Sequence, residues 1–290
     1  MFNRILTLTL LTISWPNIIA SKPNVILVMA DDLGIGDISP TNPNCKIATP
    51  YLQQLADEGL TFFDAHTTSS VCTPTRYGLL TGRYNWRSRL SRGVLNGRSE
   101  HLIPVERATL GHLLRESGYH TAMIGKWHLG LEEPNIPNSR GFDYFKGFLC
   151  DMIDDYYKHR RHGINYFREN RKEIDPTGHA TDLITKWSID YANNRKEESE
   201  PFFMYLSYNA PHTPIQPPQD WFEKVKKREP NISNQRAKLV ALDLNLHSQF
   251  TRWSHHQTAW SNAFIDGFAV DDLMQDRQYE GRCFSCSGLG

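Results

Sequence analysis

The sequence has no excess of charge of either sign. Its 32 Lys and Arg residues equal its 32 Asp and Glu residues, so the formal net charge is zero. Nucleic-acid-binding proteins usually carry a clear excess of basic residues, and this balance therefore argues against nucleic acid as the main partner. The sequence also lacks internal repeats and low-complexity linkers, and its 290 residues are enough for one large domain, or for one domain and part of a second.

A hydrophobic run long enough to cross a membrane is missing near the N-terminus. The apolar stretch at residues 5–15 is shorter than the roughly 20 residues that a membrane-spanning helix needs. It follows Arg4 and precedes Pro16 and the small residue Ala20, which is the pattern of a secretory signal peptide. We therefore expect residues 1–20 to be a signal peptide and the mature protein to be exported without a membrane span. A buried N-terminal helix is the alternative.

The cysteines are odd in number. Five cysteines cannot all pair within one chain, although export permits disulfides. Cys283 and Cys286 form a CFSC pair, which could be a disulfide or half of a metal site. No second pair lies near them in the sequence, which argues against zinc. Cys45 and Cys150 are further candidates for pairing, whereas Cys72 has unusual polar neighbours.

Three apolar segments have the character of buried strands, and each leads into polar residues. They are residues 25–30 before Asp31 and Asp32, residues 122–124 before Lys126 and His128, and residues 202–208 before His212. Continuous apolar runs are typical of strands buried on both faces of a parallel sheet. Helical segments at 49–59 and 109–118 have Thr and Gly at their ends. The alternation predicts a doubly wound α/β sheet, with the polar clusters converging at the carboxyl ends of the strands.

Asp31 and Asp32 are adjacent carboxylates at the end of the first predicted strand. Two such groups repel each other unless a cation or a proton lies between them. Their oxygens suit a hard cation such as Ca²⁺ or Mg²⁺. The pattern alone is equally compatible with a solvated loop in which an Asp caps a helix.

Cys72 lies in the segment SVCTPTRYGLLTGRY, among Ser, Thr, Pro and Arg. We expect a helix here with Thr73 as N-cap, Pro74 in the first turn and Gly82 at the end. A helix N-terminus attracts anions, and the guanidinium of Arg76 matches a tetrahedral oxyanion. The segment predicts a phosphate or sulfate site beside a reactive group. A Cys72 thiolate is one candidate nucleophile, and a buried structural cysteine is the alternative.

Lys126 and His128 lie two residues apart at the end of the second predicted strand, so both can face one pocket. A lysine supplies a point charge for an anion, and a histidine supplies a hydrogen bond or a proton. His212 lies between two prolines in APHTP, and their restricted backbone holds its loop in place. Each of these residues, taken alone, is also compatible with a structural role.

Together these segments resemble the sulfatase family. CTPTRYGLLTG at residues 72–82 is similar to the family's signature, with Pro two and Arg four residues after the Cys, and GYHTAMIGKWHLG at 118–130 is similar to its second signature. NVILVMADDLGIGD at 24–37 resembles the family's N-terminal metal strand, and YNAPHTPIQPP at 208–218 resembles its later histidine loop. The resemblance spans residues 22–218 and is strongest to the branch of arylsulfatases and N-acetylgalactosamine-sulfatases.

The resemblance implies an alkaline-phosphatase-like α/β fold, a doubly wound mixed sheet flanked by helices. It implies hydrolysis of sulfate esters on carbohydrates or aryl groups. In this family the signature cysteine is oxidised to formylglycine by a maturating enzyme, so Cys72 would be neither a disulfide partner nor a thiolate. Asp31, Asp32 and the converted Cys72 would bind one divalent ion, Ca²⁺ in most of the family.

The resemblance also implies roles for the other candidates. Arg76 would hold the site and Lys126 would bind the sulfate. His128 would hold the second hydroxyl of the hydrated aldehyde for the later release of sulfate. Asp32 would take the proton of the attacking hydroxyl, and His212 would protonate the departing alcohol oxygen.

The sequence departs from the family's pattern after about residue 238. The family's further Asp-Asn metal pair and second sulfate-binding lysine are not found, although Asp266, Asp271 and Asp272 lie in this region. We expect residues 21–238 to be the N-terminal part of the catalytic domain, with the sheet incomplete at its C-terminal side. Residues 239–290 would be a truncated or divergent tail, in which the sequence shows no clean strand and only a weak helical period.

Three other functions stay open at this point. One is an inactive sulfatase-like chain that only binds sulfated glycans. Another is a phosphoester or phosphonate hydrolase of the same superfamily, because phosphate and sulfate esters share a tetrahedral geometry. The third is a hydrolase that uses the thiolate of Cys72 as its nucleophile.

Overall fold

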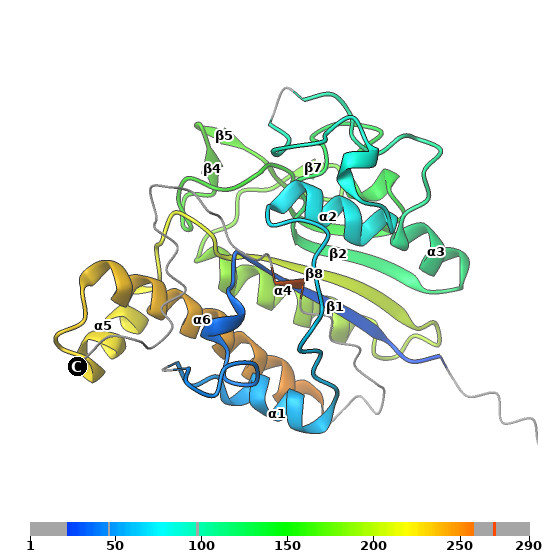
Figure 1. Ribbon diagram of the computed structural model, residues 1–290. Coiled ribbons are helices and arrows are strands. Elements are labelled where there is room, and N and C mark those ends of the chain that lie inside the picture. The colour runs from blue at the N-terminus through cyan, green and yellow to red at the C-terminus, as the bar shows by residue number, and fades with distance from the viewer. Residues whose placement is uncertain (1–21, 46, 97–98, 258–268, 271–290) are drawn as a thin grey trace, which may run out of the picture.

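The computed structural model describes residues 22–45, 47–96, 99–257 and 269–270 (Figure 1). The predicted signal peptide, the Cys283–Cys286 pair and the three late aspartates lie outside these residues. In the part of the chain that is described, no helix is both long and apolar enough to cross a membrane. Cys45, Cys72 and Cys150 all carry free thiols.

The main sheet has seven strands in the order β7-β6-β3-β2-β8-β1-β9. From β3 to β9 neighbouring strands run parallel, while β6 and β7 are antiparallel additions at one edge. A small second sheet pairs β4 with β5. The strands are β1 (Val25–Asp31), β2 (His120–Lys126), β3 (Tyr144–Phe148), β4 (Arg160–Arg161), β5 (Ile164–Asn165), β6 (Phe167–Glu169), β7 (Lys172–Glu173), β8 (Phe202–Pro211) and β9 (Ala269–Val270).

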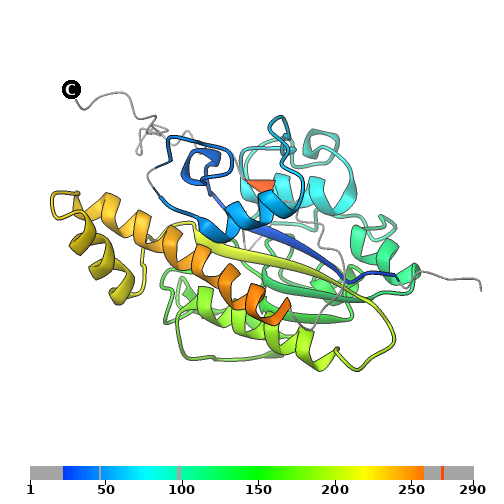
Figure 2. The ribbon, with the colours of Figure 1, turned by 90° about the horizontal axis from the view of Figure 1, so that it is seen from below.

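Helices cover both faces of this sheet, as Figures 1 and 2 show from two directions. α2 and α3 lie on one face, and α1, α4 and α6 lie on the other. The helices are α1 (Pro50–Glu58), α2 (Cys72–Thr81), α3 (Leu110–Glu116), α4 (Ala180–Asn194), α5 (Gln219–Arg228) and α6 (Asn234–Gln257), with short 3-10 turns at Ile35–Asp37, Asn85–Arg87 and Pro137–Ser139. The predicted mixed α/β sheet flanked by helices is therefore confirmed.

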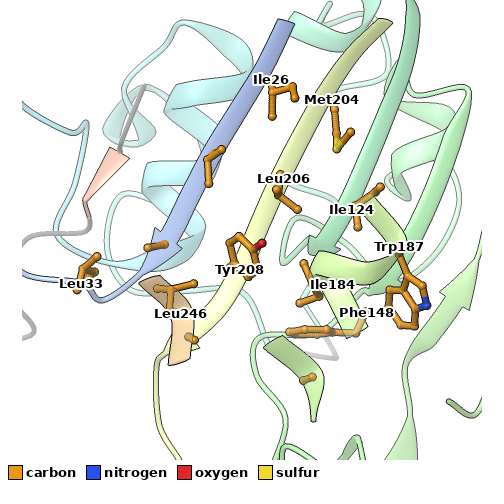
Figure 3. Close-up of a cluster of buried hydrophobic side chains, with 14 of the residues drawn as sticks. Ile26, Leu33, Ile124, Phe148, Ile184, Trp187, Met204, Leu206, Tyr208 and Leu246 are labelled. Carbon is orange, nitrogen blue, oxygen red and sulfur yellow. The ribbon is translucent and has the colours of Figure 1, made fainter. Parts of the chain in front are cut away.

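The central strands β1, β2 and β8 match the three apolar segments in the sequence. Each is buried on both faces, and its side chains alternate between two hydrophobic clusters. On β8, for example, Leu206 and Tyr208 face α4 and α6, whereas Phe203 and Tyr205 face α2. Figure 3 shows the cluster on the α4 and α6 face, in which Leu206 lies near Ile124 of β2.

The helix ends follow the sequence signals closely, with one exception. Thr109 caps α3 and forms a capping box with His112, and Gly82 ends α2 in the left-handed conformation at φ 63°. Thr73, however, is not the N-cap of α2, because Val71 occupies that position and Cys72 is already helical. Thr73 instead lies inside the first turn, where its hydroxyl makes long-range contacts.

The region after residue 238 differs from the sequence expectation. α6 runs as one helix across that position, so the expected domain boundary falls inside a helix. Leu242 and Leu246 of α6 belong to the same core cluster as β1 and β8, and Leu246 is visible in Figure 3. β9 adds a short parallel pairing to β1 at Met29 and Ala30.

Candidate active site

Asp31 and Lys126 meet at the carboxyl edge of the sheet. Asp31 is the last residue of β1 and Lys126 the last of β2, and β8 lies between these strands. Lys126 Nζ donates a hydrogen bond to Asp31 Oδ2, and both side chains are fully buried. Gly125 has φ +109°, and a side chain there would collide with the Ser207 carbonyl of β8. The predicted convergence of these two strand ends is therefore confirmed.

Arg76 enters this pair from α2. Its Nη2 lies 3.3 Å from Asp31 Oδ2, and its Nη1 donates to the Lys126 carbonyl at 2.7 Å and to the hydroxyl of Ser207. The guanidinium is fully buried and contacts protein groups from β1, β2 and β8. Of the two roles expected for Arg76, the geometry corresponds to holding the site together, because its donors already face the protein.

The buried ion pair keeps its charges. Burial alone would raise the pKa of Asp31, but the positive charges of Lys126 and then Arg76 hold that pKa well below its usual range. Burial would likewise lower the pKa of Lys126, but the charge of Asp31 outweighs it and raises that pKa. Asp31 therefore remains a carboxylate and Lys126 an ammonium group.

Asp32 follows in a left-handed backbone conformation at φ 64°, which is uncommon for a residue other than glycine. Burial, and after it the charge of Asp31, raise the pKa of Asp32 to about 7. Its Oδ2 lies 3.5 Å from Nε2 of His212. The structure thus brings the first and third polar clusters together, as the sequence predicts.

Cys72 is the first residue of α2 and is almost completely buried. Burial raises the pKa of Cys72 to about 11, although Lys126 and Arg76 favour the thiolate. A helix N-terminus and two nearby cations are therefore not enough to ionise this thiol. This environment gives no support to the thiolate nucleophile considered from the sequence.

His128 is anchored by a segment that no sequence pattern connects with it. Its ring Nε2 lies 2.9 Å from the Leu95 carbonyl, which can only accept, so Nε2 carries the proton. The Thr73 hydroxyl accepts from the Leu95 amide at 3.2 Å and donates to the His128 carbonyl at 3.3 Å. Burial, and then Lys126, lower the pKa of His128 to about 3. The ring is therefore neutral, and its Nδ1 carries no proton and has no hydrogen-bond partner among the described residues.

His212 lies beyond the end of β8, with its ring at the same sheet edge. Its Nδ1 lies 2.8 Å from the Thr213 carbonyl, so that nitrogen donates and Nε2 faces Asp32. Burial, and then the charge of Lys126, lower the pKa of His212. Tyr156 fixes this loop, because its hydroxyl lies 2.8 Å from the His212 carbonyl.

The chemistry of this edge fits a divalent cation at Asp31 and Asp32. Asp31 Oδ1 is buried and has no hydrogen-bond partner among the described residues. Asp32 beside it has its pKa raised partly by the charge of Asp31, and a cation would offset that repulsion. Within the described ranges, no group of three or more His, Cys, Asp or Glu residues is arranged to hold a metal. Further oxygens would have to come from elsewhere.

Comparison with known proteins identifies the family. A family model described as Sulfatase matches residues 23–279. The chain belongs to the sulfatase family. The chain is 31% identical over 239 residues to mouse arylsulfatase J, a match that covers 79% of the chain and 39% of that protein. It is 43% identical over 226 residues to mouse arylsulfatase G, covering 68% of the chain and 42% of that protein.

The solved structures agree with the sequence comparison. The crystal structure of Ps i-CgsB matches the chain with a TM-score of 0.76 and 28% identity, over 85% of this chain and 58% of that one. The fold of the described residues is thus that of the sulfatases, as the sequence resemblance implied. The chain spans less than half the length of the two curated relatives.

Sequence reasoning missed several residues that organise the site. Ser207 receives a hydrogen bond from Arg76, Tyr205 lies 3.4 Å from the same guanidinium, and Leu95 anchors both His128 and Thr73. Their contacts join positions 22 to 131 residues apart. Tyr205 and Ser207 lie in the apolar segment predicted as a strand, whereas Leu95 lies in none of the segments that the sequence singled out.

Proposed function

We propose that this chain hydrolyses sulfate esters, with residue 72 converted to formylglycine and with Ca²⁺ bound by Asp31, Asp32 and residue 72. The observation that carries the proposal is the meeting, at one sheet edge, of the Asp31–Lys126–Arg76 network with His212 in a member of the sulfatase family. The neutral thiol of Cys72, with its pKa of about 11, supports a nucleophile other than the thiolate.

Lys126 and the histidines have surroundings that suit the proposed chemistry. A formylglycine at residue 72 would supply a hydroxyl as nucleophile, and a cation held by Asp31 and Asp32 would supply Lewis-acid polarisation of the sulfate. Lys126 stays charged and has three donors, so it can hold Asp31 and bind a sulfate oxygen. The bare Nδ1 of His128 accepts a proton from a hydroxyl of residue 72, as a neutral imidazole does in general-base catalysis.

His212 is suited to protonate the departing alcohol oxygen. In the neutral ring the proton is on Nδ1, so Nε2 must gain a proton before it can donate one. Asp32 Oδ2, 3.5 Å from Nε2, is positioned to stabilise the protonated ring and to receive the proton of the attacking hydroxyl.

We propose a sulfated carbohydrate as the natural substrate, with aryl sulfates as the alternative. Ps i-CgsB, which this chain resembles in fold and at 28% identity, has also been solved in complex with k-i-k-neocarrahexaose. A phosphonate monoester hydrolase of Agrobacterium radiobacter matches with a TM-score of 0.59 but only 18% identity. That likeness concerns the fold alone, and it does not favour phosphoester hydrolysis here.

The maturation step has a structural requirement. Cys72, Pro74 and Arg76 are all buried in the folded chain. A formylglycine-generating enzyme must therefore reach this segment before folding is complete, and the enzyme has to be co-expressed with the chain. Treatment of the purified, folded protein should leave the thiol unconverted.

The proposal is tested by co-expressing the full chain with a formylglycine-generating enzyme and supplying Ca²⁺. We expect peptide mass spectrometry to show an aldehyde at residue 72, and we expect the protein to release sulfate from an aryl sulfate. The Cys72→Ala variant, which keeps a small buried side chain, should show neither. An aldehyde without hydrolysis of any sulfated substrate would indicate the inactive, glycan-binding alternative, and faster hydrolysis of the matching aryl phosphate would indicate a phosphoesterase.

A further inference from the structure

Asn209, near the end of β8, is a buried side chain that the roles above leave unused. Its exposure is only 1%. The backbone carbonyl of Asn209 accepts from the His212 amide at 2.9 Å and from the Tyr156 hydroxyl at 3.2 Å. The side-chain amide is different, because neither its Nδ2 nor its Oδ1 has a hydrogen-bond partner among the described residues. Such groups are rare and costly in folded proteins.

The alternation of β8 places this side chain on the α2 face of the sheet. Leu206, Tyr208 and Ala210 belong to the cluster on the α4 and α6 face. Tyr205 belongs to the cluster on the opposite face, and Ser207 contacts Arg76 of α2 there. Asn209 lies between Tyr208 and Ala210, so its side chain lies on the α2 face as that of Ser207 does, in the part of β8 where the pairing with β1 shifts register.

The neighbouring strands show what surrounds it. β8 lies between β1 and β2. Its pairing with β2 ends at Gly125–Ser207 and its pairing with β1 ends at Asp31–Pro211, so Asn209 lies in the stretch of β8 between these two pairs. Two further buried atoms at this edge have no partner within the described part of the chain, Asp31 Oδ1 and His128 Nδ1. Both of these atoms are acceptors, whereas Asn209 Nδ2 can only donate. Asn209 thus brings a donor without a partner among the described residues to the sheet edge that carries Lys126, and such a donor suits an anionic ligand.

We propose that Asn209 is a substrate-binding residue, and that its Nδ2 donates a hydrogen bond to a sulfate oxygen held by Lys126. The inference rests on the proposed sulfate-ester function and adds a neutral, directional contact to the charge of Lys126. Sulfate oxygens only accept hydrogen bonds, so the donor of an amide suits them and a carboxylate in its place would repel them. A hydrogen bond to a charged group contributes enough to change affinity by about 10- to 100-fold.

The test measures binding of inorganic sulfate by calorimetry in the full-length protein, in parallel with steady-state hydrolysis of an aryl sulfate. We expect Asn209→Ala to weaken sulfate binding by about 10- to 100-fold and to raise KM more than it lowers kcat. Asn209→Asp, which is nearly isosteric but lacks the donor, should weaken sulfate binding further. Asn245→Ala is the matched control, because Asn245 is equally buried but lies on α6, where its Nδ2 faces Asp182 at 3.4 Å. It should change stability without changing sulfate affinity.

The outcomes separate this inference from the proposed function. Sulfate binding that depends on Asn209 in a chain that hydrolyses nothing would support the inference and contradict the hydrolase. Unchanged sulfate affinity in Asn209→Ala, with or without a loss of stability, would overturn it and show a structural role. Hydrolysis by a protein that binds no sulfate would overturn the inference and leave the hydrolase intact.

Discussion

Two regions of this molecule bury ionisable side chains, one with oppositely charged partners and the other without them. At the carboxyl edge of the sheet, Asp31 contacts both Lys126 and Arg76. On α6, Asp243 is just as deeply buried, yet neither of its carboxyl oxygens has a hydrogen-bond partner among the described residues. His247, one turn later on the same helix, also has two ring nitrogens without a partner there.

The difference appears in the protonation of the two aspartates. Burial tends to raise both pKa values, but Lys126 and Arg76 reverse the effect at Asp31. At Asp243 burial dominates, with a further increase from the charge of Asp37, and the pKa rises well above its usual range. At the sheet edge Asp31 thus stays negatively charged and Lys126 positively charged. On α6, in contrast, Asp243 is buried as a neutral carboxylic acid. A buried aspartate by itself therefore does not indicate an active site. The charged groups around it determine whether it is ionised and available for catalysis.

The largest effect should come from breaking the site's ion pairs. Asp31→Asn leaves Lys126 and Arg76 buried without the carboxylate that neutralises them. Leaving buried charge uncompensated costs about 3–5 kcal/mol, so we expect the free energy of unfolding to fall by that amount and hydrolysis to be lost. Urea denaturation measures the first effect, and sulfate release from an aryl sulfate measures the second. A fall below about 1 kcal/mol would contradict the assigned network, because that is the range of an exposed ion pair.

The two regions also differ in how far the sequence predicts them. β1, β2 and β8 are buried on both faces, so they read as unbroken apolar runs, and their polar ends mark the edge where the site forms. α6 carries Asp243, Asn245 and His247 at buried positions. These polar residues interrupt the apolar period of 3.6 that identifies a helix, and the helix was therefore left without a prediction.

Within the site, residue types were predictable but several contacts were not. Asp31, Lys126 and His212 could be placed from strand ends alone. The link from His128 through Leu95 to Thr73 joins three segments that are distant in the sequence, and no local pattern encodes it. Thr73 was expected as a cap because Thr is a common capping residue. Its hydroxyl is engaged by the Leu95 amide and the His128 carbonyl instead.

A second, smaller effect should appear on α6 under acid conditions. Burial lowers the pKa of His247 from 6.5 to about 4. Between these values the unfolded chain binds more protons than the folded one, so stability falls as the pH drops from 6.5 toward 4, by about 3 kcal/mol in total. We expect His247→Leu to lose less stability over this interval than the unmodified chain, as measured by urea unfolding at several pH values. Parallel pH profiles for both proteins would show that His247 is not held neutral by burial.

At pH 4, the smallest effect should come from Asp243→Asn, which makes the same substitution as at Asp31 in the other region. Near pH 4 the folded protein already holds Asp243 uncharged, so the exchange should change the free energy of unfolding by less than about 1 kcal/mol. As the pH rises above 3.8, the unfolded aspartate ionises while the folded one stays protonated because of its raised pKa. The unmodified chain therefore loses stability relative to the variant as pH rises. Unfolding curves at pH 4 and pH 7 measure this difference. A loss at pH 7 as large as that of Asp31→Asn would mean that Asp243 is ionised and paired, and the contrast between the two regions would then fail.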